Sequence, residues 1–447
     1  MHSEYTLESL CSDLRRGTVS AAEIRQRALN IEAKNSQLNC FIRSSGDAEE
    51  HFAEADDSQK GAPLYGIPVS FKDNICVAGL PVTVGTQGMA DCIATHDAVI
   101  VRKLKSLGAV VAGKNNMNEL CFGVTSIEPY WGAVENPSAP GYSVGGSSSG
   151  CAAAVAAGIV PIAIGTDTGG SARIPASFCG ITGFRPTSGH WSSSGIIPIS
   201  HTKDSPGLMT RTASDAHFLY TQLSSDDVST AEQGTFPCRI GLPLSMWSEL
   251  DDDVMTHCRH AINQLVLAGF ECVDVDDAAV FFLNQTITFT LPIYEFFIDF
   301  PRTLLSLGWE NRITAVFDNI SDKNVRNIIH EYLGGGRISP ADYVSAVRNI
   351  GRLRLDMDTL FSTYGIDMLV YPTVPRQVPP LSQTGRPELF AELIRNTDLA
   401  SNAAMPSVTL PVAPEGALPV GLSFDASRGR DGYLLSMAAR IETIIKP

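Results

Sequence analysis

Apolar positions along the chain alternate between helical and strand spacing, beginning near the N-terminus. Residues 20–35 open with Ser20 and Glu23 in a capping-box arrangement and continue with apolar residues at helical spacing, which predicts a helix. A short β-branched run over 66–73 then predicts a strand. Because this run closes on a charged pair before a turn, we expect Lys72 at the strand end.

The rest of the chain repeats this alternation. The expected elements are helices over 98–107, 149–158 and 432–443, and strands over 109–112, 162–165, 367–373 and 406–411. Asp97 is expected to cap the first of these helices. An alternation of strands and helices favours an α/β fold, with a mixed, mostly parallel central sheet that helices cover on both faces.

One domain accounts for the whole chain. Its 447 residues contain no low-complexity segment that would divide them, so we predict a single domain over 1–447. The 236–365 block is richer in helical patterns and aromatic residues, and we expect it to be a helical insertion that lines a substrate pocket. Packing explains the aromatic residues over 281–300 better than a cofactor or membrane role does.

Composition limits the classes of partner. The chain has 33 Lys+Arg against 48 Asp+Glu, a net charge of −15, which argues against nucleic acid or an anionic membrane as the main partner. No apolar run reaches the ~20 residues that span a bilayer. The first residues are polar rather than a basic segment followed by an apolar core, so we expect no secretory signal.

The cysteine and histidine patterns predict neither disulfides nor a metal. Ten cysteines are scattered without a CxxC pair, which indicates buried thiols in a reducing, cytoplasmic compartment. His257 and His260 have the spacing of two zinc ligands but lack a third, so no metal site is expected.

The stretch 145–173 is the strongest candidate for a functional site. Clusters of glycine and serine over 145–150 and 165–173 flank an apolar run over 151–165. Two flexible linkers would be the simpler interpretation, but linkers do not enclose a segment that must be buried. Glycine beside serine lets the backbone approach a ligand closely, so hydroxyl and N–H groups can converge there. We therefore interpret 145–173 as an active site.

A serine nucleophile needs a base, and the sequence offers no obvious histidine. None occurs between His96 and His190, and the sequence around Ser171 is not the GxSxG turn of α/β-hydrolases. A lysine remains, because burial disfavours the charged ammonium of that side chain.

Three segments together resemble the amidase signature family of Ser-cisSer-Lys amide hydrolases. They are GGSSSG over 145–150, GTDTGGSAR over 165–173, and the Lys-Asp pair at 72–73. The resemblance runs from about residue 38 to 215 and resumes over 402–407 and 418–422. It implies the α/β fold of that family and an enzyme without a cofactor or metal.

The resemblance also implies a role for each residue of the motif. Ser171 would attack the amide carbonyl, Ser147 would follow a cis peptide bond and relay the proton, and Lys72 would be the base. The backbone N–H groups of an oxyanion hole would come from Thr168, Gly169, Gly170 and Ser171. The residues implied as supports of this turn are Ser148, Asp167 and Arg173. A surface ion pair with Asp73 is the alternative for Lys72.

The family does not fix the substrate. Segments 175–180 and 196–212 are most similar to those of indoleacetamide and mandelamide hydrolases, which implies a small aryl or arylalkyl primary amide as the substrate. The sequence leaves open whether the chain forms a homodimer. The pocket candidates are Phe122, Thr125 and Ile174. The alternatives are a glutamine-hydrolysing amidotransferase subunit, a urea-derivative amidohydrolase, or a non-catalytic binding protein on the same fold.

Overall fold

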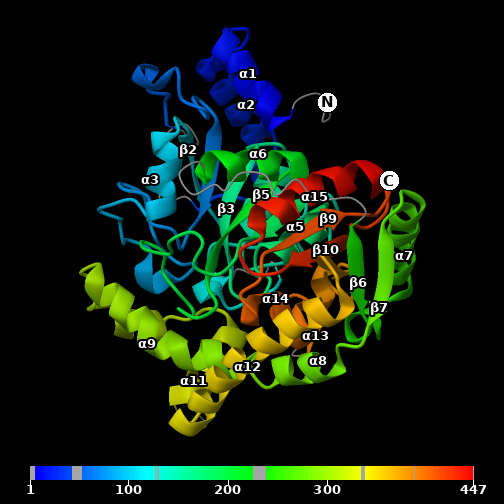
Figure 1. The fold of residues 1–447 in the computed structure, drawn as a ribbon. Helices are drawn as coiled ribbons and strands as arrows, with labels where there is room; N and C mark the ends of the chain where they lie inside the picture. Colours follow the sequence, from blue (N-terminus) through cyan, green and yellow to red (C-terminus); the bar gives the residue numbers. More distant parts are fainter. Residues whose placement is uncertain are drawn as a thin grey trace.

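The structure is a computed structural model that describes residues 6–42, 53–125, 127, 130–224, 238–333, 338–386 and 388–445. Ten strands of the described chain form one sheet, in the order β2-β1-β3-β5-β4-β9-β10-β8-β6-β7 (Figure 1). The strands are β1 (Pro68–Lys72), β2 (Val110–Asn115), β3 (Ile162–Asp167), β4 (Thr182–Arg185), β5 (Ser205–Thr210), β6 (Arg239–Pro243), β7 (Glu271–Val275), β8 (Met368–Pro372), β9 (Ser407–Pro411) and β10 (Gly421–Ala426).

Helices surround this sheet (Figure 1). They are α1 (Leu7–Arg16), α2 (Ala21–Lys34), α3 (Val99–Ser106), α4 (Ser149–Ala156), α5 (Arg173–Cys179), α6 (Ala213–Leu223), α7 (Asp252–Leu267), α8 (Ala278–Gln285), α9 (Thr290–Ser306), α10 (Arg312–Asp318), α11 (Lys323–Leu333), α12 (Pro340–Tyr364), α13 (Leu389–Ile394), α14 (Asp398–Asn402) and α15 (Asp431–Ile445). The predicted α/β class is confirmed.

The sheet is mixed, but less parallel than the sequence indicated. Its two ends are parallel, with β2-β1-β3 at one end and β8-β6-β7 at the other. The strands between them, from β3 through β5, β4, β9 and β10 to β8, pair antiparallel. The expectation of a mostly parallel sheet is therefore wrong, because strand direction depends on connections that apolar spacing does not encode.

Side chains of the central strands alternate between two cores, one on each face of the sheet. In β3, Ile162 and Ile164 join one apolar cluster, while Ala163 joins the other. In β5 the neighbours Leu208 and Met209 divide in the same way. Helices α4 and α5 cover one face, and α6 and α15 cover the other. Both faces are thus buried, as the sequence predicted.

Local signals predicted one helix start correctly and another incorrectly. Ser20 and Glu23 form a complete capping box at the start of α2. Helix α3 begins at Val99 without a side-chain cap. Asp97 instead accepts a hydrogen bond from the Ala78 N–H at 2.8 Å and forms an ion pair with Lys105 at 2.8 Å. The expected cap by Asp97 is therefore wrong, because its carboxylate bonds the Ala78 N–H and the Lys105 side chain instead.

The 236–365 block is not helical throughout. Residues 236–237 lie outside the described chain, and the next part supplies β6 and β7 to the sheet. Helices α8 to α12 follow, and we call residues 278–364 the helical block. Among the helices of the described ranges, none is both long and apolar enough to cross a membrane.

Candidate active site

Lys72 lies at the end of β1, buried between the parallel strands β2 and β3. Loops that follow the carboxyl ends of such strands meet at one edge of the sheet. The Lys72 side chain is fully buried, and its Nζ lies 2.7 Å from Ser147 Oγ and 2.9 Å from Thr166 Oγ1. The strand end was predicted correctly, and the structure brings Lys72 into contact with one of the two candidate serines.

Asp73 does not pair with Lys72. Its carboxylate lies 3.4 Å from Lys114 Nζ and accepts hydrogen bonds from the N–H and hydroxyl of Thr83. Burial raises the pKa of Asp73, and Lys114 and Thr83 oppose that rise. The alternative in which Lys72 forms an ion pair with its neighbour is therefore not what the geometry shows.

Ser147 follows a cis peptide bond from Gly146. A Cβ at Gly146 would overlap the amide of Asn118, so only glycine fits at this position. The backbone N–H of Asn118 donates to the Ser147 carbonyl at 3.3 Å. The serine is thus held by its backbone as well as by Lys72.

The two glycine-serine clusters are in direct contact. The Ser148 N–H donates to the carbonyl of Ser171 at 3.2 Å, and the Ser148 hydroxyl donates to the carbonyl of Thr166 at 3.2 Å. These bonds join the start of α4 to the turn after β3. Ser171 is 8% exposed, so the candidate nucleophile lies at the edge of the buried cluster.

Asp167 organises the turn that carries Ser171. Its carboxylate accepts the N–H groups of Gly170 at 2.9 Å and Ala172 at 3.2 Å, together with the guanidinium of Arg173 at 2.9 and 3.0 Å. Arg185 also lies 3.2 Å from this carboxylate. A single buried side chain therefore fixes both flanks of the turn.

The charges in this cluster stabilise one another. Burial alone would raise the pKa of Asp167, but Arg173 and Arg185 hold that pKa well below its usual range. Burial would lower the pKa of Arg173, and Asp167 raises it instead. Both groups therefore stay charged, and a buried ion pair of this kind tolerates loss of neither partner.

The oxyanion-hole candidates divide into two groups. The Gly170 N–H already donates to Asp167 in this structure, which argues against its expected contribution. Within the ranges that the structure describes, the N–H groups of Thr168, Gly169 and Ser171 have no protein acceptor. These three remain the candidates for an oxyanion hole.

The three pocket candidates, Ile174, Phe122 and Thr125, have different surroundings. A Cβ at Gly170 would lie 2.8 Å from Ile174 Cδ1, so Ile174 packs against residues 166–173, which we call the catalytic turn because they carry the candidate nucleophile. The ring of Phe122 lies 5.0 Å from that of Phe296 in α9, edge to face. Thr125 is partly buried on the same loop as Phe122. The structure therefore places Ile174 beside the turn of Ser171 and Phe122 against the helical block.

Sequence reasoning missed three side chains that hold the site. Thr166 bonds Lys72, Asp204 accepts the Thr168 hydroxyl at 2.6 Å, and Thr397 donates its hydroxyl to the Gly169 carbonyl at 2.6 Å. Thr166 had a usable signal, because a hydroxyl in a buried strand end requires a partner. Thr397 lies more than 200 residues from the turn in sequence, and no local pattern points to it.

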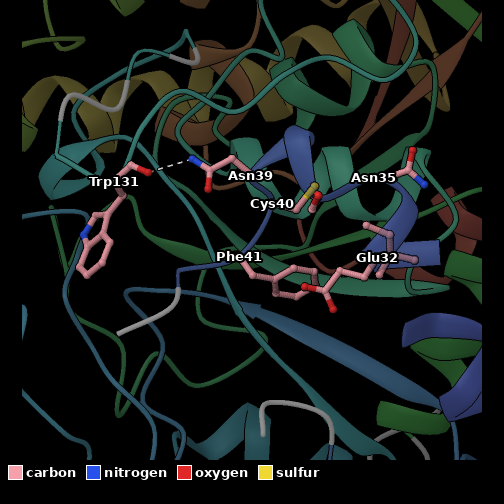
Figure 2. Close-up of a pocket in the computed structure, with 8 residues that line it drawn as sticks. Glu32, Asn35, Asn39, Cys40, Phe41 and Trp131 are labelled. Carbon is pink, nitrogen blue, oxygen red and sulfur yellow. Dashed lines mark hydrogen bonds between the residues drawn. The ribbon is translucent and has the colours of Figure 1, made fainter. Parts of the chain in front are cut away.

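A separate cavity of about 170 Å³ lies near the end of α2. Figure 2 shows Glu32, Asn35, Asn39, Phe41 and Trp131 around it, with Asn39 donating to the Trp131 carbonyl at 2.8 Å. None of its lining residues belongs to the lysine-serine cluster. Its size alone does not make it the active site.

His201, Glu295 and Asp299 have the spacing of metal ligands, and sequence reasoning did not find them. Glu295 already accepts hydrogen bonds from Thr202 and Tyr343, and Asp299 Oδ2 lies 2.8 Å from His201 Nδ1. Both carboxylates are therefore already hydrogen-bonded, Glu295 to two hydroxyl groups and Asp299 to the imidazole of His201. The cluster joins α9 to the loop before β5.

A sequence model of the family described as Amidase matches residues 23–435. The chain belongs to the amidase family. The match includes β1, β3 and both glycine-serine clusters, so the family covers every residue of the site described above. The resemblance noted in the sequence is confirmed, and the chain is an amide hydrolase.

Full-length relatives support the same assignment. The chain is similar to an indoleacetamide hydrolase of Pseudomonas savastanoi, with 59% identity that covers 100% of this chain and 98% of that protein. A mandelamide hydrolase of Pseudomonas putida is 32% identical, covering 99% and 92% of the two chains. A crystal structure of an amidase matches with a TM-score of 0.83 at 28% identity, covering 99% of this chain and 100% of that one.

Proposed function

We propose that this amidase hydrolyses indoleacetamide to the arylacetic acid and ammonia. The observation that carries the mechanism is the buried contact between Lys72 Nζ and Ser147 Oγ at 2.7 Å, next to the turn of Ser171. The substrate rests on the full-length relatives at 59% and 60% identity that are named indoleacetamide hydrolases. Comparing indoleacetamide with a simple aliphatic amide, which lacks the ring, would show whether the enzyme recognises the ring.

The proposed reaction moves protons along a relay of Ser171, Ser147 and Lys72. Ser171 Oγ attacks the carbonyl carbon while Ser147 takes the proton of Ser171 and passes its own to a neutral Lys72. The relay then runs backwards and protonates the departing nitrogen, which leaves as ammonia. Ser147 and Lys72 then take a proton from a water molecule that attacks the acyl-enzyme, and this proton returns to Ser171 Oγ as the acid leaves.

Backbone donors stabilise the negative charge on the carbonyl oxygen. The N–H groups of Thr168, Gly169 and Ser171 supply them in this proposal, and one such donor is worth about 3 kcal/mol of the barrier. Thr397 and Asp204 hold this turn from outside through the Gly169 carbonyl and the Thr168 hydroxyl. Thr166 keeps the Lys72 amine directed at Ser147.

We also propose a cytoplasmic location. All ten cysteines are free thiols, and nine of them are buried. Burial raises the pKa of several of them, with Cys121 at about 11 and Cys151 at about 12. Such thiols stay protonated and unreactive, as expected of structural cysteines in a reducing compartment.

A panel assay of released ammonia tests the proposed substrate. The panel contains indoleacetamide, mandelamide, hexanamide, glutamine and biuret, and we expect the highest kcat/KM on indoleacetamide. Preference for glutamine would favour an amidotransferase subunit, and preference for biuret a urea-derivative hydrolase. Either result would overturn the proposal.

Covalent labelling tests the proposed nucleophile. A fluorophosphonate should label the wild-type chain at Ser171 and leave Ser171→Ala unlabelled, with mass spectrometry locating the adduct. A folded wild-type sample that takes no label would support the non-catalytic alternative instead.

A further inference from the structure

Two aromatic rings meet where the helical block approaches the C-terminal part of the chain. Phe289 immediately precedes α9, and Phe390 lies in α13. Their ring centroids are 5.9 Å apart with planes inclined by 42°. Phe289 is 44% exposed, so much of its ring is not covered by protein. A large exposed aromatic face beside a second ring is suited to a flat apolar ligand.

One chain of contacts leads from Phe289 to the catalytic turn. The preceding residue, Thr288, donates its hydroxyl to Asp398 at 2.7 Å. Asp398 pairs with Lys203 at 2.7 Å, and its Oδ1 lies 3.0 Å from where a Cβ of Gly169 would be. Gly169 is one of the oxyanion-hole candidates. The segment before α9 is thereby fixed close to the reacting centre.

A second, independent chain of contacts leads there from Phe390. This ring packs against an apolar cluster that includes Val124, Phe178 and Ile174. Ile174 in turn contacts Gly170, which follows Gly169 in the turn. The apolar cluster and the Thr288–Asp398 bond therefore reach the same turn by separate routes. Because the two rings contact each other, both routes begin at the Phe289–Phe390 pair and end at the turn.

We propose that Phe289 and Phe390 form the wall of the site that binds the aryl group of the substrate. This inference rests on the proposed function and assigns the recognition of the ring to two particular residues. Aromatic rings prefer offset or edge-to-face contacts at centroid distances of about 4.5–7 Å. An arylacetic amide held by Ser171 carries its ring on a short CH₂ link and would seat it against this pair. An amide with a flexible aliphatic chain gains less there.

Kinetics on two substrates test the proposal. Phe289→Leu and Phe390→Leu are compared with wild type on indoleacetamide and on hexanamide. We expect kcat/KM for indoleacetamide to fall about three- to tenfold, mainly through KM, while kcat/KM for hexanamide changes less than twofold. Phe289→Tyr keeps the ring and should restore the wild-type selectivity.

Phe282→Leu is the matched control. Phe282 is 70% exposed on α8 in the same block and makes no aromatic contact among the described residues. The control should leave both substrates unchanged. A loss of selectivity in Phe282→Leu as large as in Phe289→Leu would point to a general loosening of the block and overturn the proposal.

Failure of the inference differs from failure of the proposed function. Wild type that does not hydrolyse indoleacetamide removes the proposed function, and the variants are then not needed. Wild type that does hydrolyse it, with unchanged selectivity in both leucine variants, removes only the aryl wall. If Phe390→Leu unfolds early in thermal melting, Phe289→Leu and Phe289→Tyr decide the question, because Phe289 is already half exposed.

Discussion

The catalytic turn and the helical block are built in different ways. Around residues 166–173 the backbone itself is packed so closely that a Cβ at Gly165 would lie 2.7 Å from Ser148 Oγ. In the helical block, apolar side chains such as Leu305 and Leu355 are 62% and 66% exposed. One region admits almost no added atom, whereas the other leaves large side chains in solvent.

Their polar contacts differ in the same way. The turn is held by a buried ion pair between Asp167 and Arg173, both 0% exposed. The helical block approaches the turn through single side chains. An example is Thr288, whose hydroxyl donates to Asp398 beside Gly169. The two regions therefore differ both in packing density and in the kind of polar contact that holds them.

Replacing Lys72 should produce the largest effect. Lys72→Met preserves most of the side-chain volume but removes the amine, so kcat/KM should fall about a thousandfold or more while the chain stays folded. Ammonia release and circular dichroism measure the two quantities. If Lys72→Met retains near-normal turnover, lysine is not part of the relay.

Ser70→Ala is the control on the same strand. Ser70 is fully buried in β1, and its hydroxyl has no hydrogen-bond partner among the residues described. Removing an unpartnered buried hydroxyl should cost little or stabilise slightly. Wild-type turnover in this variant would show that the loss in Lys72→Met reflects the amine and not damage to β1.

The sequence predicted the catalytic turn better than the helical block. Glycines beside serines mark a close backbone approach, and the burial of 151–165 follows from its composition. Both signals are local, and both are present in the structure. The family motif then supplied the roles of Lys72, Ser147 and Ser171, which the structure brings into one cluster but whose chemistry stays a prediction.

Tertiary contacts explain what could not be predicted. The Gly170 N–H is taken by Asp167, an interaction set by the fold of the turn rather than by its composition. Strands β6 and β7 lie in a block that was expected to be helical. They pair with each other, and β6 also pairs with β8, which lies more than 90 residues further along the chain. Thr397 bonds the turn, and Thr288 bonds Asp398 beside it, and both lie more than 100 residues from the turn in the sequence.

Adding one methyl group to each region tests the comparison more directly. Gly170 has φ +132°, and a Cβ there would meet Ile174 and Thr397. Gly170→Ala should therefore lower the free energy of unfolding by roughly 2–4 kcal/mol. Gly351 is exposed within α12 with nothing within 4 Å of a Cβ, so Gly351→Ala should raise that free energy by about 0.5–1 kcal/mol.

Urea unfolding monitored by circular dichroism measures both alanine variants. Opposite signs are the expected outcome. If both variants shift the unfolding midpoint in the same direction, the turn is not as closely packed as its contacts indicate.

A pH-dependent effect concerns Asp425, a buried carboxylate of β10. Burial raises the pKa of Asp425 to about 6 despite the nearby Arg173 guanidinium, and Asp425 accepts the Tyr371 hydroxyl at 2.7 Å. In the unfolded chain an aspartate has a pKa of about 3.9. Between these two values the unfolded chain is ionised while the folded chain still holds its proton. Folding stability contributed by this group is therefore present below pH 4 and is lost as the pH rises to 6.

Asp425→Asn removes this dependence. Each pKa unit corresponds to about 1.4 kcal/mol, so the stability of the variant relative to wild type should increase by up to about 3 kcal/mol between pH 4 and pH 6. Asp356→Asn, at a partly exposed ion pair on α12, should shift stability by less than about 1 kcal/mol. Urea unfolding at pH 4, 5, 6 and 7 measures both. A flat difference for Asp425→Asn would mean that the carboxylate is ionised in the folded protein, with its charge balanced by Arg173.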